Sequence, residues 1–213
     1  MKALVDNDIL LKGTCYGLLP DLIGTISGQG RVGFLGAARF VLVKHLEKKR
    51  LRGDPSLARA RLLGFLAEND VVEPTTQEQA LAAEFESAAQ RLAVSLDSGE
   101  SQLVAILLAR AIAWLSTGDK RAIVAIERML DTEAALAAAR NRILCLEQLI
   151  QTLLPIRGIG FVRAAICGEP DIDRSLSICF SCRSQDVVQA SVIEGLNSYV
   201  ADLRRSAPRV LAT

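Results

Sequence analysis

The sequence predicts an α/β fold in which helices cover both faces of a small parallel sheet. Short apolar runs at residues 3–5, 70–74, 111–115 and 143–146 are typical of buried strands. Longer segments with helical spacing separate these runs, and strands joined through helices form crossover units that give parallel sheets. Because 50% of the residues are hydrophobic and 23% are charged, the chain can bury a core, and a disordered protein is excluded.

The first part of the chain is expected to supply one strand and several helices. Residues 3–5 form the first strand, and residues 10–26 form two short helices broken at Pro20, because proline cannot continue a helix. After a turn at residues 28–30, apolar side chains recur at helical spacing over residues 32–51. Asp54 and Pro55 then open another helix, so residues 31–68 are predicted to form a helical hairpin.

The following part alternates strands with helices. A short strand at residues 70–74 precedes a helix that Thr75 or Thr76 caps and that runs toward residue 90. A second helix begins near Ser98, and the apolar run at residues 111–115 leads into a helix at 120–130. The last strand, at residues 143–146, is followed by a helix to residue 154.

The pattern changes after Pro155, which divides the chain into a predicted domain at residues 1–155 and a helical carboxyl-terminal extension at residues 156–213. A long helix from about Asp186 to Ser206 carries an apolar stripe of Ile193, Leu196, Val200 and Leu203. Such a stripe most often packs on the protein's own core and less often on a partner subunit.

Length, charge and hydropathy exclude several classes of protein. The 213 residues carry a net charge of +1 and a mean hydropathy of +0.28, so no strong overall field attracts nucleic acid or a membrane. The longest apolar stretch, at residues 103–115, is shorter than the ~20 residues of a spanning helix, and no signal peptide is visible. We therefore expect a cytoplasmic protein whose five cysteines are reduced thiols.

Charge is distributed unevenly along the chain. Residues 31–61 hold nine Lys or Arg, whereas residues 64–100 hold eight acids and one arginine. The basic hairpin could contact phosphates above an acidic metal site, or the two segments could simply pair with each other. Under the first interpretation, the candidate RNA contacts are Arg39, Lys44, Lys48 and Lys49.

Acidic residues follow the ends of predicted strands or begin helices. Asp6 and Asp8 follow the first strand, Glu100 lies in a first helical turn, and Asp119 follows the run at residues 114–118. Functional groups gather at the carboxyl ends of parallel strands, and converging carboxylates need a cation or a proton to offset their repulsion. Oxygen ligands suit Mg²⁺ or Mn²⁺, which can activate water for phosphodiester hydrolysis. Taken singly, each acid could instead be a helix cap.

Three motifs occur in an order that resembles PIN-domain ribonucleases. Asp6-Asn7-Asp8-Ile9-Leu10 resembles the opening motif of this family, and Asp97-Ser98-Gly99-Glu100-Ser101 is similar to the Gly-Glu helix of one branch. Ser116-Thr117-Gly118-Asp119-Lys120 is similar to the later motif of the same branch. The resemblance covers roughly residues 1 to 155 and implies a three-layer α/β/α fold. In active members it also implies RNA cleavage that depends on Mg²⁺ or Mn²⁺.

The resemblance assigns roles to individual residues. Asp6, Glu100 and Asp119 would be catalytic and metal-site acids, with Thr117 and Asp8 in support. The family has one further acid on a helix before the Gly-Glu motif. Glu78 is the candidate for it, and Glu73 and Glu47 are rivals.

Two other functions remain open. A module that keeps the fold without catalysis would bind or regulate, and a basic residue such as Lys120 would then fill the place of the metal. Many relatives are toxins of toxin-antitoxin pairs, so the chain could also be a toxin or defence component. Its carboxyl-terminal helices would then dock an antitoxin or a second copy in a homodimer.

Overall fold

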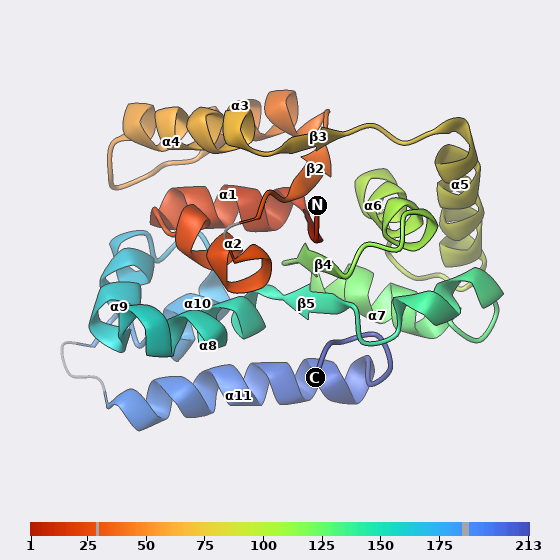
Figure 1. Ribbon diagram of the computed structural model, residues 1–213. Coiled ribbons are helices and arrows are strands. Elements are labelled where there is room, and N and C mark those ends of the chain that lie inside the picture. Colours follow the sequence, from red (N-terminus) through yellow and green to blue (C-terminus); the bar gives the residue numbers. More distant parts are fainter. Residues whose placement is uncertain (29, 185–187) are drawn as a thin grey trace.

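Five parallel strands form the centre of the computed structural model, which describes residues 1–28, 30–184 and 188–213 (Figure 1). The strand order is β3-β2-β1-β4-β5, so the first strand lies in the middle and the later strands extend the sheet on both sides. Every neighbouring pair is parallel, which confirms the predicted sheet. The strands are β1 (Ala3–Val5), β2 (Gly33–Leu35), β3 (Asp70–Val72), β4 (Trp114–Thr117) and β5 (Ile143–Cys145).

Helices cover both faces of the sheet and complete a three-layer α/β/α fold. Successive side chains of a strand point to opposite faces, so Val5 and Leu4 belong to different cores. The core around Val5 is covered by α1 (Asn7–Tyr16), α2 (Leu19–Ser27), α3 (Ala38–Lys48), α4 (Pro55–Glu68) and α8 (Leu146–Arg157). The core around Leu4 is covered by α5 (Thr76–Arg91), α6 (Ser98–Ala109), α7 (Lys120–Met129) and the 3-10 helix η1 (Ala134–Ala139).

The carboxyl-terminal part packs along the β5 side of the molecule. It contains α9 (Ile159–Gly168), α10 (Arg174–Cys179) and α11 (Gln189–Ser206), and α11 runs below α8 and α7 in Figure 1. Leu196 of α11 joins one core and Leu203 joins the other, so the predicted apolar stripe packs on the protein's own core at these positions. Beyond α11, Leu211 forms a parallel bridge with Ile143 and covers the exposed edge of β5.

Two boundaries in the first part of the chain differ from the sequence-based prediction. The helix predicted from residue 32 begins only at Ala38, because Gly33–Leu35 are buried and pair as β2 between β1 and β3. The break between the first two helices lies at Gly17, whose φ of 68° is a left-handed conformation that glycine adopts without steric cost. Pro20 instead lies in the first turn of α2, where its missing N–H has no helical partner to lose. Gln29 and Asp186, within the predicted turn and at the predicted start of the long helix, lie outside the described residues.

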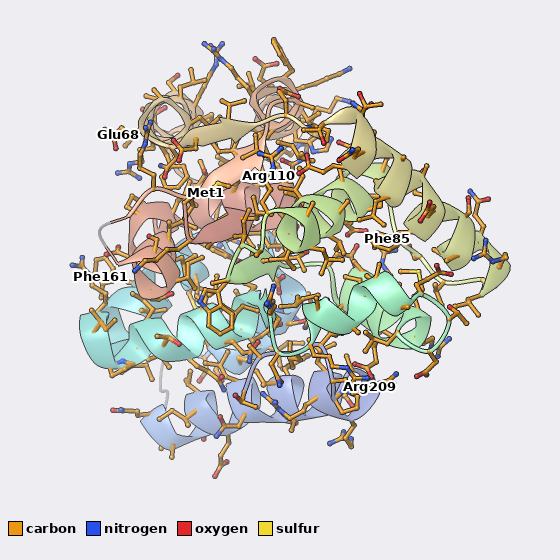
Figure 2. The ribbon with its side chains drawn as sticks, turned by 45° about the vertical axis from the view of Figure 1, so that its right-hand side comes forward. Met1, Glu68, Phe85, Arg110, Phe161 and Arg209 are labelled. Atoms are coloured by element: carbon orange, nitrogen blue, oxygen red, sulfur yellow. A yellow bond between two sulfur atoms is a disulfide. The ribbon has the colours of Figure 1, made fainter. Side chains whose placement is uncertain are left out.

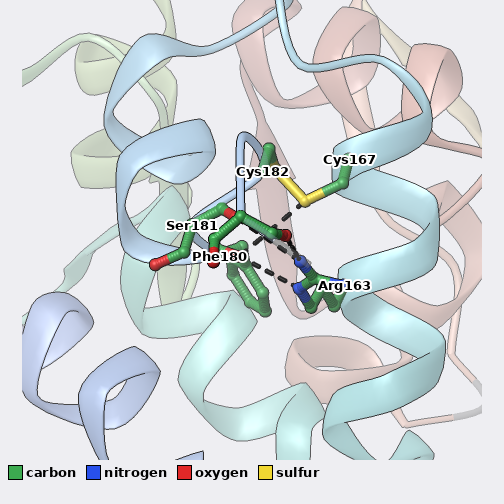
Figure 3. The surroundings of a disulfide bond; sticks show 6 residues. Arg163, Cys167, Phe180, Ser181 and Cys182 are labelled. Atoms are coloured by element: carbon green, nitrogen blue, oxygen red, sulfur yellow. Dashed lines mark hydrogen bonds between the residues drawn. A yellow bond between two sulfur atoms is a disulfide. The ribbon is translucent and has the colours of Figure 1, made fainter. Parts of the chain in front are cut away.

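A disulfide between Cys167 and Cys182 corrects the expectation that all five cysteines are reduced (Figure 3). It links α9 to the segment after α10, 15 residues apart in sequence. Arg163 strengthens the same junction because its guanidinium donates hydrogen bonds to the carbonyl oxygens of Phe180 and Ser184. Cys15, Cys145 and Cys179 are free and buried.

The described helices are too short or too polar to cross a membrane.

Candidate active site

The three predicted catalytic acids lie at the carboxyl ends of two neighbouring strands and at one helix start. Asp6 follows β1 and caps the amino terminus of α1, and its Oδ1 accepts a hydrogen bond from the backbone N–H of Asn7 at 2.6 Å. Asp119 follows β4 and caps α7 in the same way. Glu100 lies in the first turn of α6. Because β1 and β4 are adjacent and parallel, their ends bring Asp6 and Asp119 to one edge of the sheet.

A threonine hydroxyl connects the two strand ends. Oγ1 of Thr117 donates a hydrogen bond to Oδ2 of Asp6 at 2.9 Å, and the same oxygen accepts one from the backbone N–H of Asp119 at 3.1 Å. Thr117 and Asp6 are both buried. The hydroxyl therefore fixes the orientation of the Asp6 carboxylate and the path of the chain into α7.

Glu100 is held by a capping box at the start of α6. Its Oε2 accepts a hydrogen bond from the backbone N–H of Asp97 at 2.9 Å, and the Asp97 side chain accepts one from the backbone N–H of Glu100. These two residues join Asp6 and Asp119 in what we call the acid cluster. Only 8% of the Glu100 surface is exposed, so most of its side chain has lost contact with water.

Burial and mutual repulsion raise the proton affinity of two members of the acid cluster. Burial, followed by the negative charges of Asp97, Asp119 and Asp6, raises the pKa of Glu100 to about 8. Burial also raises the pKa of Asp6 to about 6, and Asp8 and Asp97 add to the effect. The hydrogen bonds that Asp6 accepts from Thr117 and Asn7 oppose this rise only in part. Both carboxyls therefore hold a proton more tightly than an exposed carboxyl does.

Arg121 is the cation that contacts the acid cluster. Its guanidinium and its backbone N–H both bind the Asp119 carboxylate, with Nη2 to Oδ2 at 2.7 Å. Burial acts to raise the pKa of Asp119, but the hydrogen bonds and charge of Arg121 outweigh it and lower the pKa. Lys120, the residue considered for this place from the sequence, instead pairs with the buried Glu147 at 2.5 Å.

Asp8 faces a second set of charges next to the acid cluster. Its carboxylate pairs with Lys12 at 2.6 Å, and Lys12 also pairs with Asp173 of the carboxyl-terminal part at 2.7 Å. Gly118 provides the space, because a Cβ at that position would lie 2.0 Å from Oδ2 of Asp8. Sequence reasoning missed Lys12, Asp173 and Glu147. Only the four-residue spacing of Asp8 and Lys12 gave a local signal.

Glu78, the fourth predicted metal ligand, has a different role in the structure. Its two carboxylate oxygens each bind Arg110 at 2.7 Å, and Oε2 also accepts the backbone N–H of Thr75 in the capping box of α5. The hydrogen bonds from Arg110 lower the pKa of Glu78 to about 2. Arg110 thus neutralises the charge of the Glu78 carboxylate. Of the rivals, Glu73 lies against Gly36 after β2, and Glu47 is exposed on α3.

The predicted RNA contacts lie on the exposed side of the helical hairpin. Arg39, Lys44 and Lys48 are exposed on α3, and Lys49 is exposed directly after it. Since α3 follows the carboxyl end of β2 and rises 1.5 Å per residue, Lys48 lies roughly 14 Å further along the helix than Arg39. Among the described residues, the ion pairs join the hairpin to the acidic segment only through Arg31 and Asp70. The two segments therefore do not neutralise each other broadly.

The donor chemistry of the acid cluster fits a hard divalent cation, since it offers carboxylate oxygens alone. In the described part of the chain, however, no three acidic, histidine or cysteine side chains stand close enough together to hold a metal ion. The Asp119 carboxylate is bound to the Arg121 guanidinium through both oxygens. Metal binding requires Asp119 to exchange the guanidinium for the ion.

The chain matches no protein-family model, and neither the curated proteins nor the solved structures give a match. The function is therefore inferred from the residues of the site.

Proposed function

We propose that the protein is a Mg²⁺- or Mn²⁺-dependent ribonuclease that resembles the PIN-domain family. The observation that carries this proposal is the acid cluster: Asp6 and Asp119 follow two adjacent parallel strands, and their charges act on Glu100 at the start of α6. Open parallel sheets bind ligands at this edge. The three motifs that form the cluster are the same three that carry the resemblance.

The proton affinities of the cluster support a cation site. With a pKa near 8, Glu100 is largely protonated at neutral pH, and Asp6 has a pKa of about 6. Burial is the largest cause of both shifts and neighbouring carboxylates add to it, so a cation that enters the cluster would stabilise the charged forms. A divalent ion displaces the protons, so its affinity rises with pH.

Each residue of the site has a defined part in the proposed reaction. Asp6, Glu100 and Asp119 would hold the ion, and Thr117 positions the Asp6 carboxylate through its hydroxyl. Asp8 would support the ion from beside the cluster, and Lys12 pairs with its carboxylate. When bound, such an ion supplies a water activated at neutral pH and charge neutralisation on phosphodiester oxygens.

One observation favours a second candidate, a PIN-like binding or regulatory module without catalysis. Arg121 already neutralises Asp119, which is how a site that has lost its metal would be stabilised. The Arg121 side chain is nevertheless 77% exposed, so it can leave Asp119 without a large desolvation cost. A protein partner, either an antitoxin or a second copy, is proposed under both candidates on the strength of the resemblance alone.

The first test is cleavage of a short single-stranded RNA by the purified chain with Mn²⁺, with Mg²⁺ and with EDTA. We expect cleavage with either metal, none with EDTA, and a loss of at least roughly a hundredfold in the Asp119→Asn protein. Glu84→Gln, which changes an exposed acid on α5, is the matched control and should cut normally. Cutting that persists in Asp119→Asn would identify a contaminating nuclease.

Calorimetry with Mn²⁺ separates the two candidates directly. Titrations in buffers of different ionisation enthalpy should show proton release at pH 7, because Glu100, whose pKa is about 8, loses its proton when the ion binds. Arg121→Gln should bind Mn²⁺ more tightly than the wild type, since Asp119 then has no competing cation. Absence of Mn²⁺ binding in both proteins would establish the non-catalytic module.

A further inference from the structure

We propose that a groove between α7 and α11 binds the backbone of single-stranded RNA and leads it to the acid cluster. This inference rests on the proposed ribonuclease function and names the path of its substrate. The α7–α11 groove has a volume of about 580 Å³. Its charged and aromatic lining consists of Lys120, Arg121, Arg128, Tyr199 and Asp202.

The α7–α11 groove begins where the acid cluster ends. Asp119 is the cap of α7, and the next two residues, Lys120 and Arg121, line the groove. Ser95 lines it as well and lies two residues before Asp97, which caps α6. One end of the groove is thus lined by close sequence neighbours of Asp119 and Asp97.

The exposed cations of the groove lie on one side of α7. Arg121 and Arg128 are seven residues apart, so they share a face of the helix about 10 Å apart along its axis. The Arg128 side chain is exposed, and no ion pair to it is found in the described ranges. The acid Asp202 is paired with Arg205 at 2.8 Å, so the groove keeps a positive balance.

Lys120 and Tyr199 build the wall of the groove and do not offer a free contact. The Lys120 ammonium lies over the Tyr199 ring, 4.7 Å from its centre, and also pairs with Glu147. This contact holds α11 against α7. Val124, Ala125 and Leu203 form an apolar floor between them. Arginines above an apolar floor suit a single strand, whose bases are unpaired and whose phosphates stay outside.

The groove also explains the position of Arg121. A phosphate that enters the groove competes with Asp119 for the guanidinium, because both ligands accept paired hydrogen bonds from it. Transfer of Arg121 to the phosphate frees Asp119 for a divalent ion. Substrate binding and metal binding at the acid cluster would then reinforce each other.

The experiment measures binding of a short fluorescent single-stranded RNA to the full chain by anisotropy in EDTA, where no cleavage occurs. Arg128→Ala should weaken binding by roughly three- to tenfold at low salt and reduce the slope of log K against log salt by about 0.7. Arg128→Lys should recover most of the affinity. Arg140→Ala removes the same charge from an exposed position directly after η1 and should bind like the wild type, and Lys48→Ala tests the basic hairpin separately.

Each alternative result has a distinct meaning. Normal binding by Arg128→Ala overturns the groove, and weakened binding by Lys48→Ala would move the path to the basic hairpin. A duplex or a single-stranded DNA of the same sequence that binds as well as the RNA would overturn the stated ligand. If Arg128→Ala binds weakly while the wild type never cuts with Mn²⁺, the groove stands and catalysis fails. If the wild type cuts and Arg128→Ala binds normally, catalysis stands and the groove fails.

Discussion

At the scale of single residues, two glutamates hold the same position in the same local motif and have opposite electrostatic properties. Glu78 and Glu100 are each the third residue of a helix and each complete a capping box. Glu78 meets Arg110, which lowers its pKa to about 2, whereas burial and then the charges of other acids raise the pKa of Glu100 to about 8. The local motif is the same at both glutamates, so the neighbours that the fold places around each side chain cause the difference in pKa.

This contrast predicts opposite effects of pH on the stability of two matched variants. Between about pH 4.5 and 8, folded Glu100 retains a proton that the unfolded chain has released, so the stability of the wild type falls as pH rises. Glu100→Gln keeps the capping hydrogen bond and removes this loss. It should equal the wild type at pH 4 and exceed it at pH 8 by on the order of 2 kcal/mol, after solvent screening is allowed for.

Glu78→Gln is the matched control, and urea unfolding at several pH values is the measurement. The lowered pKa of Glu78 means that its stabilising effect is present at neutral pH and is lost as pH falls from about 4.5 toward 2. Its substitution should therefore destabilise the protein at pH 7. A Glu100→Gln protein that is less stable than the wild type at pH 8 would contradict the repulsion described for the acid cluster.

The site residues that could be predicted from sequence are those that belong to local motifs. Asp6, Glu100 and Asp119 each follow a strand or begin a helix, and those positions can be identified without the fold. Arg121 was two residues from a candidate acid and was still missed, because nothing local says whether its guanidinium turns back to Asp119. Asp173 is far away in sequence and reaches Lys12 only through packing of the carboxyl-terminal part.

At the scale of elements, periodicity located the helices well and failed at β2. Ala38, Leu42 and Leu46 are buried at the helical spacing that was expected. The same spacing continues toward the amino terminus over Phe34 and Leu35. There, however, three residues form β2, an interior strand of the sheet that is buried on both faces. So short an apolar run is compatible with either structure, and its pairing with β1 and β3 decides which one forms.

The chain end after α11 is fixed to α7 by one buried carboxylate, and this gives an element-scale prediction. Glu127 of α7 accepts hydrogen bonds from the backbone N–H groups of Arg209 and Val210 and from the Arg209 guanidinium. Figure 2 labels Arg209 beside the end of α11. Arg209→Ala leaves this buried charge without its cation and should lower the free energy of unfolding by about 3 kcal/mol. Arg205→Ala breaks an exposed pair with Asp202 and should change it by less than about 0.5 kcal/mol.

Fluorescence of Trp114, the one tryptophan of the chain, reports on β4 during urea unfolding of both variants. Equal stability of Arg209→Ala and Arg205→Ala would show that the Glu127 contacts do not fix the chain end. A selective loss in Arg209→Ala would show that the Glu127 contacts stabilise the fold by fixing the chain end to α7.

At the scale of the whole molecule, residues 156–213 are bound to the rest of the chain at several separate places. Val192 and Leu196 join the core around Val5, and Leu203 and Leu211 join the core around Leu4. Asp173 meets Lys12 on α1, next to the acid cluster. The boundary predicted at Pro155 followed a change of local pattern, but local pattern carries no information on these long-range contacts.

Reduction of the disulfide tests whether the carboxyl-terminal part supports the acid cluster. Cys167–Cys182 closes a loop of 15 residues that contains α10 and Asp173, and such a closure stabilises a folded chain by about 3 kcal/mol. Dithiothreitol should lower the free energy of unfolding, followed at Trp114, by up to this amount. It should have no further effect on a Cys167→Ser/Cys182→Ser protein. Because Asp173 shares Lys12 with Asp8, the reduced protein should also bind Mn²⁺ more weakly at the acid cluster. If reduction lowers stability but leaves Mn²⁺ affinity intact, α10 holds the carboxyl-terminal part together without influencing the acids.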